Sequence, residues 1–323
     1  MTNSLFTLLR RIAWGECDPA RICYTPRAID YAVEAVEAWC EEVLGVSWVE
    51  MADRYGLDVS FVQVACDYLR PLVASQVVNL QVLVIGAERS NVTFIVIGED
   101  GDGALCFQAL LVGCFVERKN KASIPIPGEF RQRIETYQTQ CGEAVEVLDY
   151  ANHPALTSGR SAGGSGTDNV SRHPLPTDAS IFSRKRRVVY GDCDASGIIY
   201  PPRVFNYAIE TVEELYVAVL GISWMDLVCK RKQGAPFISV SCEFLSPMVP
   251  GETIINAVWI PRLGETSIEF TVTGYDAKGD PCYDAHLVAC FIDQDGFKTM
   301  RIPEVFRMRI QAYQSECEAI QEG

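Results

Sequence analysis

The sequence contains few basic residues and few histidines. Its 28 lysines and arginines stand against 42 aspartates and glutamates, giving a formal net charge of −14, and only three histidines are present. Because a protein that binds nucleic acid needs a basic face to neutralise phosphates, this charge excludes nucleic acid as the expected partner. An anionic ligand would require a local basic patch on an otherwise acidic chain.

The chain also lacks the long apolar runs of a membrane or secreted protein. No stretch approaches the roughly 18 consecutive apolar residues of a membrane-spanning helix. The N-terminal apolar run from Leu5 to Leu9 is too short for a signal peptide and is followed by Arg10 and Arg11. We therefore expect a cytoplasmic protein with no membrane partner.

Cysteine is abundant, but its pattern lacks the spacing of a zinc site. The thirteen cysteines include no CxxC motif, and their number is odd. This pattern disfavours both structural zinc and a disulfide framework, and it fits free thiols in a reducing compartment. We therefore predict no metal and no cofactor.

The sequence does contain an internal repeat with a constant offset of 176 residues. Residues 15–27 read GECDPARICYTPR, and residues 191–203 read GDCDASGIIYPPR. A repeat of this length predicts two copies of one domain. Five cysteine pairs share the offset, which predicts that they are inherited core positions: Cys17/Cys193, Cys66/Cys242, Cys106/Cys282, Cys114/Cys290 and Cys141/Cys317.

The repeat divides the chain into residues 1–150, a connection over 151–180 and residues 181–323. The connection is rich in glycine, serine and proline and poor in apolar residues, which predicts a flexible linker. His153 and His173 belong to this segment and are expected to be solvated.

Each half shows the same predicted order of elements, which indicates an α+β fold. A short strand leads into the repeated aspartate loop, a long helix follows, and four strands and a terminal helix complete the half. A long central helix wrapped by an antiparallel sheet is the hotdog pattern, and two such halves are expected to form an intrachain pseudo-dimer. The sequence leaves open whether two chains form a homodimer. In the first half, the expected elements are a strand around 5–14, a helix over 26–44, strands over 59–69, 77–87, 91–98 and 105–116, and a terminal helix over 127–141. In the second half, the expected ranges include a strand around 185–190, a helix over 202–220 and a terminal helix over 303–317.

The segment that opens each long helix resembles that of the 4-hydroxybenzoyl-CoA thioesterase family of hotdog hydrolases. The resemblance covers both halves. It implies that Asp18 and Asp194 match the catalytic aspartate. It also implies that the residue seven positions later, Thr25 or Pro201, matches the position whose backbone N–H polarises the thioester carbonyl. A helix N-terminus suits this task because its N–H groups are unpaired and its dipole end is positive.

The two copies depart from the family pattern at different residues. Arg21 replaces the loop glycine in the first copy, where it would block the thioester or contact a carboxylate or phosphate, whereas Gly197 keeps the second loop open. Pro201 has no N–H to donate, whereas Thr25 keeps this donor. We therefore expect two unequal sites, and the sequence does not rank them.

Other roles are open for several of these residues. Asp18 and Asp194 could instead cap the helix or brace the loop. Tyr24 and Tyr200 are expected to pack under the loop or to line the substrate together with Arg21 and Gly197.

The predicted function is hydrolysis of an acyl- or aryl-thioester of CoA or of a carrier protein, with an aspartate as nucleophile or general base. Two alternatives are a carrier-protein off-loading or cyclising enzyme and a non-catalytic protein that binds an acyl-thioester. Hotdog dehydratases use a histidine on or near the central helix, and neither predicted helix contains one. Dehydration is therefore disfavoured. The sequence does not identify the acyl group.

Overall fold

The computed structural model describes residues 5–146, 175–176 and 181–321. The chain divides into two compact units, which lie within Met1–Asn169 and Val170–Gly323. Most of the predicted linker, including His153 and His173, lies outside the described residues. The proposed domain limits and the pseudo-dimer therefore stay predictions.

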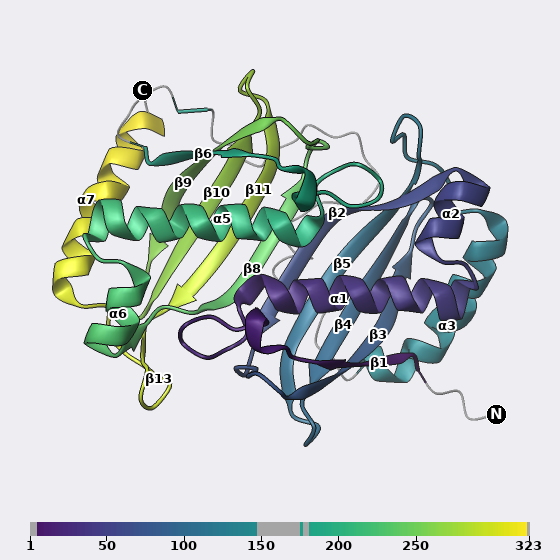
Figure 1. Cartoon of the computed structure of the whole chain (residues 1–323), viewed down its shortest axis with the longest axis horizontal. Coiled ribbons are helices and arrows are strands. Elements are labelled where there is room, and N and C mark those ends of the chain that lie inside the picture. The colour runs from purple at the N-terminus through teal and green to yellow at the C-terminus, as the bar shows by residue number, and fades with distance from the viewer. Residues whose placement is uncertain (1–4, 147–174, 177–180, 322–323) are drawn as a thin grey trace. The chain divides into compact units, whose positions relative to one another are not determined.

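The first unit consists of one long helix packed on a five-stranded antiparallel sheet (Figure 1). The sheet order is β1-β3-β4-β5-β2. Helix α1 lies across one face of this sheet, and it contacts β3, β4 and β5. The elements are β1 (Thr7–Arg11), α1 (Thr25–Trp39) with a π-helical continuation (Cys40–Leu44), α2 (Trp48–Tyr55), β2 (Leu57–Tyr68), β3 (Val77–Ala87), β4 (Asn91–Glu99), β5 (Leu105–Glu117) and α3 (Gly128–Glu146).

The second unit repeats this arrangement, with strand order β8-β11-β10-β9-β6. It adds a small three-stranded sheet that the sequence did not predict, formed by β7, β12 and β13. The elements are β6 (Ser183–Arg187), α5 (Pro201–Leu215) with a π-helical continuation (Tyr216–Leu220), α6 (Trp224–Arg231), β7 (Gln233–Gly234), β8 (Phe237–Phe244), β9 (Thr253–Leu263), β10 (Ser267–Tyr275), β11 (Pro281–Cys290), β12 (Ile292–Asp293), β13 (Lys298–Thr299) and α7 (Glu304–Gln321).

The apolar stripe predicted for the central helix is the face that packs on the sheet. Ile29, Val33 and Val36 are fully buried, and the Trp39 ring meets Phe94 edge-on at 5.1 Å between ring centroids. Side chains three and four positions apart lie on one side of a helix, so this spacing buries them together. The spacing therefore positions the helix N-terminus at a defined end of the sheet.

Helix boundaries differ from the prediction by a few residues. Each central helix begins one residue earlier than predicted, at Thr25 and Pro201. Both end at a glycine in the left-handed conformation, Gly45 (φ 68°) and Gly221 (φ 67°), as expected for a helix C-terminus. The terminal helices begin one residue later than predicted and run past Cys141 and Cys317 to Glu146 and Gln321.

All thirteen cysteines have free thiols. Four of the five repeated cysteine pairs are buried, as predicted for core positions. The prediction is wrong for Cys17 and Cys193, which are half-buried because they lie in the aspartate loop rather than on a strand.

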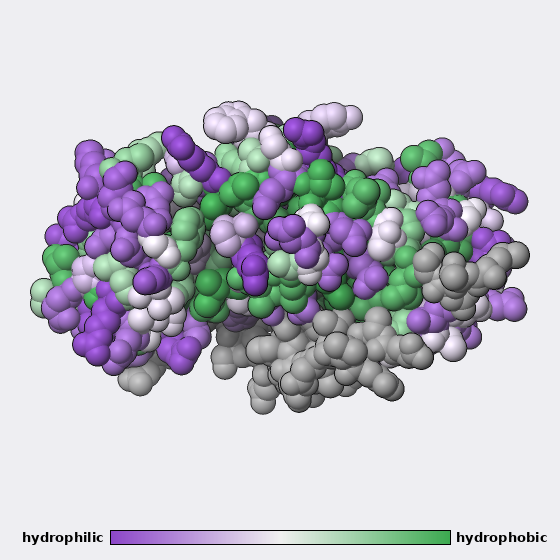
Figure 2. All heavy atoms as spheres, turned by 90° about the horizontal axis from the view of Figure 1, so that it is seen from below, coloured by the Kyte–Doolittle hydropathy of each residue, from purple (hydrophilic) through white to green (hydrophobic). Residues whose placement is uncertain are grey.

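Hydrophilic and apolar side chains are interspersed over the face that Figure 2 shows. Within the described ranges, no helix is both long enough and apolar enough to cross a membrane.

Candidate active site

The repeated aspartate segment forms the same compact loop in both units. In the first unit, Asp18 donates its N–H to the Ile22 carbonyl at 2.9 Å, and Arg21 donates its N–H to the Asp18 carbonyl at 2.8 Å. The second unit has the equivalent bonds, from Asp194 to Ile198 at 2.9 Å and from Gly197 to Asp194 at 3.0 Å. The loop connects a short 3-10 turn to the central helix, and it therefore places the aspartate and the helix start in one short segment.

Neither aspartate caps the helix, so that alternative is wrong. The N-cap residues are Tyr24 and Tyr200, and neither makes a side-chain capping bond. Each aspartate instead braces its own loop. Asp18 Oδ1 accepts the N–H of Ala20 at 2.8 Å, and Asp194 Oδ1 accepts the N–H of Ser196 at 2.8 Å.

The two carboxylates differ in their surroundings. Asp18 is half-buried, and burial raises its pKa although the N–H groups of Ala20 and Ile22 oppose this effect. Asp194 has an additional partner, because Ser196 also donates its hydroxyl to Oδ1 at 2.6 Å. The equivalent residue of the first loop is Ala20, which has no hydroxyl to donate to Asp18.

The two helix N-termini differ in their backbone donors. In the described residues, the N–H of Thr25 at the first position of α1 has no hydrogen-bond partner. The next residue is Pro26, and the N–H of Arg27 is bonded to the Tyr24 carbonyl at 2.8 Å. Helix α5 begins with Pro201 and Pro202, which have no N–H. Among these opening positions, Thr25 alone supplies a donor for an oxyanion.

Arg21 occupies a backbone conformation that favours glycine. Its φ is 66°, and the equivalent Gly197 has a φ of 83°. The Arg21 side chain is exposed and has no ion pair among the described residues, and its expected contact with a carboxylate or phosphate stays a prediction. The substrate-binding roles of Arg21, Gly197, Tyr24 and Tyr200 stay predictions.

Replacing Arg21 with glycine is expected to stabilise the first unit by about 1 kcal/mol, because glycine adopts a left-handed conformation without steric cost. Urea unfolding followed by circular dichroism measures the effect. Gly197→Ala is the matched change in the second unit and should destabilise it by a similar amount. No atom lies within 4 Å of the added Cβ, so the left-handed backbone alone accounts for this loss of stability. Equal stabilities for Arg21→Gly and the unmodified chain would contradict this explanation.

A network of charged and aromatic side chains, which no local sequence pattern predicted, holds the loop against the helix. Tyr31 donates its hydroxyl to Glu16 at 2.8 Å, and Arg10 pairs with Glu16 at 2.7 Å. The guanidinium of Arg10 also lies 4.8 Å from the centre of the Tyr31 ring and binds Glu34 at 2.9 Å. The repeat offset could have revealed this network, because the second unit has the equivalent residues: Arg186, Asp192, Tyr207 and Glu210.

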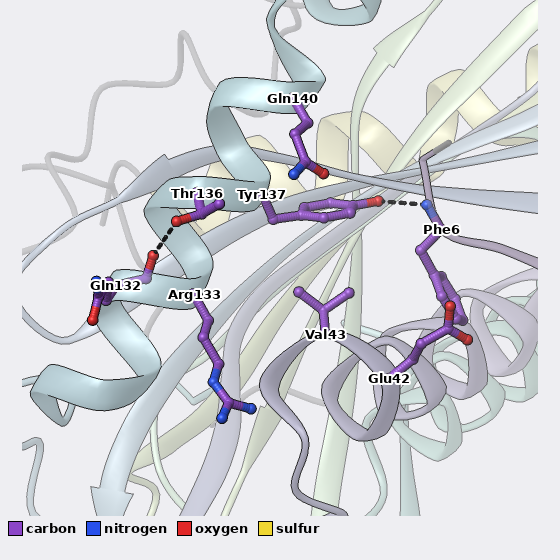
Figure 3. A pocket seen from close by; sticks show the side chains of 8 residues that line it. All are labelled: Phe6, Glu42, Val43, Gln132, Arg133, Thr136, Tyr137 and Gln140. Carbon is purple, nitrogen blue, oxygen red and sulfur yellow. Dashed lines mark hydrogen bonds between the residues drawn. The ribbon is translucent and has the colours of Figure 1, made fainter. Parts of the chain in front are cut away.

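The cavities described in the first unit do not include the aspartate loop. One of about 410 Å³ lies between α3 and the end of the central helix (Figure 3). There Tyr137 accepts the N–H of Phe6 at 2.9 Å. A second, of about 650 Å³, is lined in part by Arg118 and Lys119. Arg118 and the nearby Lys121 pair with Asp58, at 3.6 Å and 2.6 Å.

Two protein families match the two halves of the chain separately. Residues 12–134 match the Thioesterase-like superfamily, and residues 197–283 match the Thioesterase superfamily. A 1,4-dihydroxy-2-naphthoyl-CoA hydrolase from Prochlorococcus marinus subsp. pastoris is 24% identical over 134 residues, which cover 40% of this chain and 87% of that protein. Less than half of the chain therefore matches nearly all of this relative.

Two solved structures share the fold over most of the chain. The 12:0-ACP thioesterase from Umbellularia californica has a TM-score of 0.64 at 12% identity and covers 88% of this chain and 93% of its own. An acyl-ACP thioesterase from Bacteroides thetaiotaomicron has a TM-score of 0.60 at 11% identity, covering 88% of this chain and 97% of its own. These structures share the tandem hotdog fold, and the two family matches show that the chain belongs to the thioesterase superfamily, a family of thioester hydrolases.

Proposed function

We propose that the chain hydrolyses an acyl- or aryl-thioester of coenzyme A or of a carrier protein, and that the first aspartate loop is its catalytic centre. The observation that carries this proposal is the unpaired N–H of Thr25 in the same segment as the half-buried Asp18. The second unit has a carboxylate in the same loop but no N–H at the first two helical residues. Only the first loop therefore combines a carboxylate with an oxyanion donor.

Asp18 acts in one of two ways at the thioester carbonyl. As a nucleophile, its carboxylate forms a C–O bond, the C–S bond breaks, and the thiolate leaves and takes up a proton; water then hydrolyses the resulting anhydride. As a general base, Asp18 accepts a proton from the water that attacks the carbonyl. In both cases the negative charge that develops on the carbonyl oxygen is stabilised by the Thr25 N–H and by the positive end of α1.

The substrate classes follow from the relatives and stay proposals for this chain. The relative named above is a hydrolase of an aryl-CoA, and the two solved structures are thioesterases of acyl carrier proteins. The relative favours an aromatic acyl group on CoA as the substrate, and the two solved structures favour a fatty acyl group on a carrier protein. Both classes contain the same thioester, so the chemistry at Asp18 is unchanged.

A panel of aryl-CoA, acyl-CoA and acyl-carrier-protein thioesters tests the proposal. Loss of the thioester should be followed by chromatography, because the free thiols of the chain, including the exposed Cys229, react with the usual thiol reagents. Hydrolysis of any member supports the proposal. Turnover restricted to carrier proteins with a cyclic or transferred product favours the off-loading alternative. Binding without turnover of any member would contradict hydrolysis and favour the non-catalytic alternative.

A further inference from the structure

A tyrosine from the sheet contacts the N-terminus of the first central helix. Tyr68 is the last residue of β2, and its hydroxyl donates a hydrogen bond to the Thr25 carbonyl at 2.7 Å. A tyrosine hydroxyl keeps its proton at neutral pH, and burial raises the pKa of Tyr68 further above its usual value. The residue that supplies the oxyanion donor is therefore tied directly to a strand of the sheet.

The second unit has the same cross-strand pair with the hydroxyl on the other strand. Tyr68 lies opposite Phe107 in the register of β2 and β5. Phe244 lies opposite Tyr283 in the register of β8 and β11. Tyr283 donates its hydroxyl to Asn256 Oδ1 at 2.6 Å, within the core. Phe244 has no hydroxyl to donate to the start of α5.

Both loops also share one backbone anchor. Cys23 donates its N–H to the Leu72 carbonyl at 2.7 Å, and Ile199 donates its N–H to the Met248 carbonyl at 2.8 Å. The hydroxyl of Tyr68 is therefore an anchor that the first unit has in addition, and it acts on the same residue as the free N–H. The unit whose helix starts with Pro201 lacks both the donor and this anchor.

We propose that Tyr68 is a positioning residue for thioester hydrolysis, and that it holds Thr25 so that its N–H points at the oxyanion. This inference rests on the proposed function of the first loop. The terminal residues of a helix fray readily, whereas an oxyanion donor stabilises the transition state only within hydrogen-bonding distance of the developing charge. A bond from the sheet to the first helical residue restricts this motion without contacting the substrate.

The test is Tyr68→Phe, with kcat and KM measured on the substrate that the panel identifies. Phenylalanine occupies the equivalent position 244, so the fold is expected to accept it. Because one hydrogen bond is lost, we expect kcat to fall about five- to tenfold, with KM within about twofold of the unmodified chain. The matched control is Tyr283→Phe, which removes a hydroxyl from the equivalent pair and should lower the melting temperature while kcat stays within about twofold.

Asp18→Asn in the same assay separates the two proposals. Both variants are assayed well below their melting temperatures. If Asp18→Asn is inactive but Tyr68→Phe has the kcat of the unmodified chain, the positioning role is wrong and the proposed function stands. A rise in KM with unchanged kcat would likewise overturn positioning, because it would assign Tyr68 to substrate binding. If Asp18→Asn retains full activity, the proposed function itself is wrong.

Discussion

Replacing Asp18 with asparagine is expected to lower kcat by about 10²–10⁴-fold, the range that a general base or nucleophile typically contributes. Asparagine has nearly the same shape, and its side-chain oxygen can still accept the N–H of Ala20 that braces the loop. It cannot attack the thioester or accept a proton from water. Steady-state kinetics on purified protein with an unchanged melting temperature would therefore measure chemistry rather than unfolding.

The matched control is Asp194→Asn in the second unit. Asp194 has the same loop geometry but lies ahead of a helix without an N–H at its first two positions. We expect this variant to keep kcat within about twofold of the unmodified chain. Equal losses for the two variants would contradict the assignment of catalysis to the first loop alone, and a larger loss for Asp194→Asn would reverse it.

Replacing Thr25 with proline is expected to lower kcat by about 10²–10³-fold, the usual cost of one oxyanion-hole donor. The change reproduces the Pro-Pro start of α5 in the first unit. It should be tolerated, because the preceding residues Tyr24 (φ −63°, ψ 132°) and Tyr200 (φ −70°, ψ 126°) already share the extended conformation that proline requires before it. The Thr25 carbonyl that accepts the Tyr68 hydrogen bond is also retained.

Thr25→Ala controls for the side chain, because it keeps the backbone N–H and removes the hydroxyl. We expect kcat for this variant within about threefold of the unmodified chain. If Thr25→Ala loses as much activity as Thr25→Pro, the side chain rather than the backbone donor contributes to the reaction. Circular dichroism and melting temperatures of both variants show whether the helix start has changed.

Much of the fold could be predicted from the sequence because its signals are local. Apolar residues three and four positions apart predicted the central helix, and Pro26 and Gly45 marked its two ends to within a residue. The strand predicted over 77–87 matches β3 throughout its length. The sheet of β7, β12 and β13 was missed because its strands are two residues long and show no alternating pattern.

The candidate site could be predicted only in part from local sequence signals. Asp18, Thr25 and Pro201 were predicted from the repeat and the family resemblance, since both depend on residues close together in the chain. The buried cysteines were predicted from the offset alone, and the prediction failed for Cys17 because an offset does not tell a strand from a loop. The Tyr68–Thr25 bond joins residues 43 positions apart, and no local pattern predicts such a contact.

From the amino-acid sequence we could predict a tandem duplication, a helix wrapped by a sheet in each half, and a backbone donor at only one of the two helix starts. These features depend on residue type and spacing, because proline has no N–H wherever it lies. The folded structure was needed to show that Asp18 braces its loop rather than capping the helix, that burial raises its pKa, and that the Tyr68 hydroxyl on β2 donates a hydrogen bond to the Thr25 carbonyl. Those properties arise from solvent exclusion and from contacts between distant residues, which form only when the sheet packs against the helix.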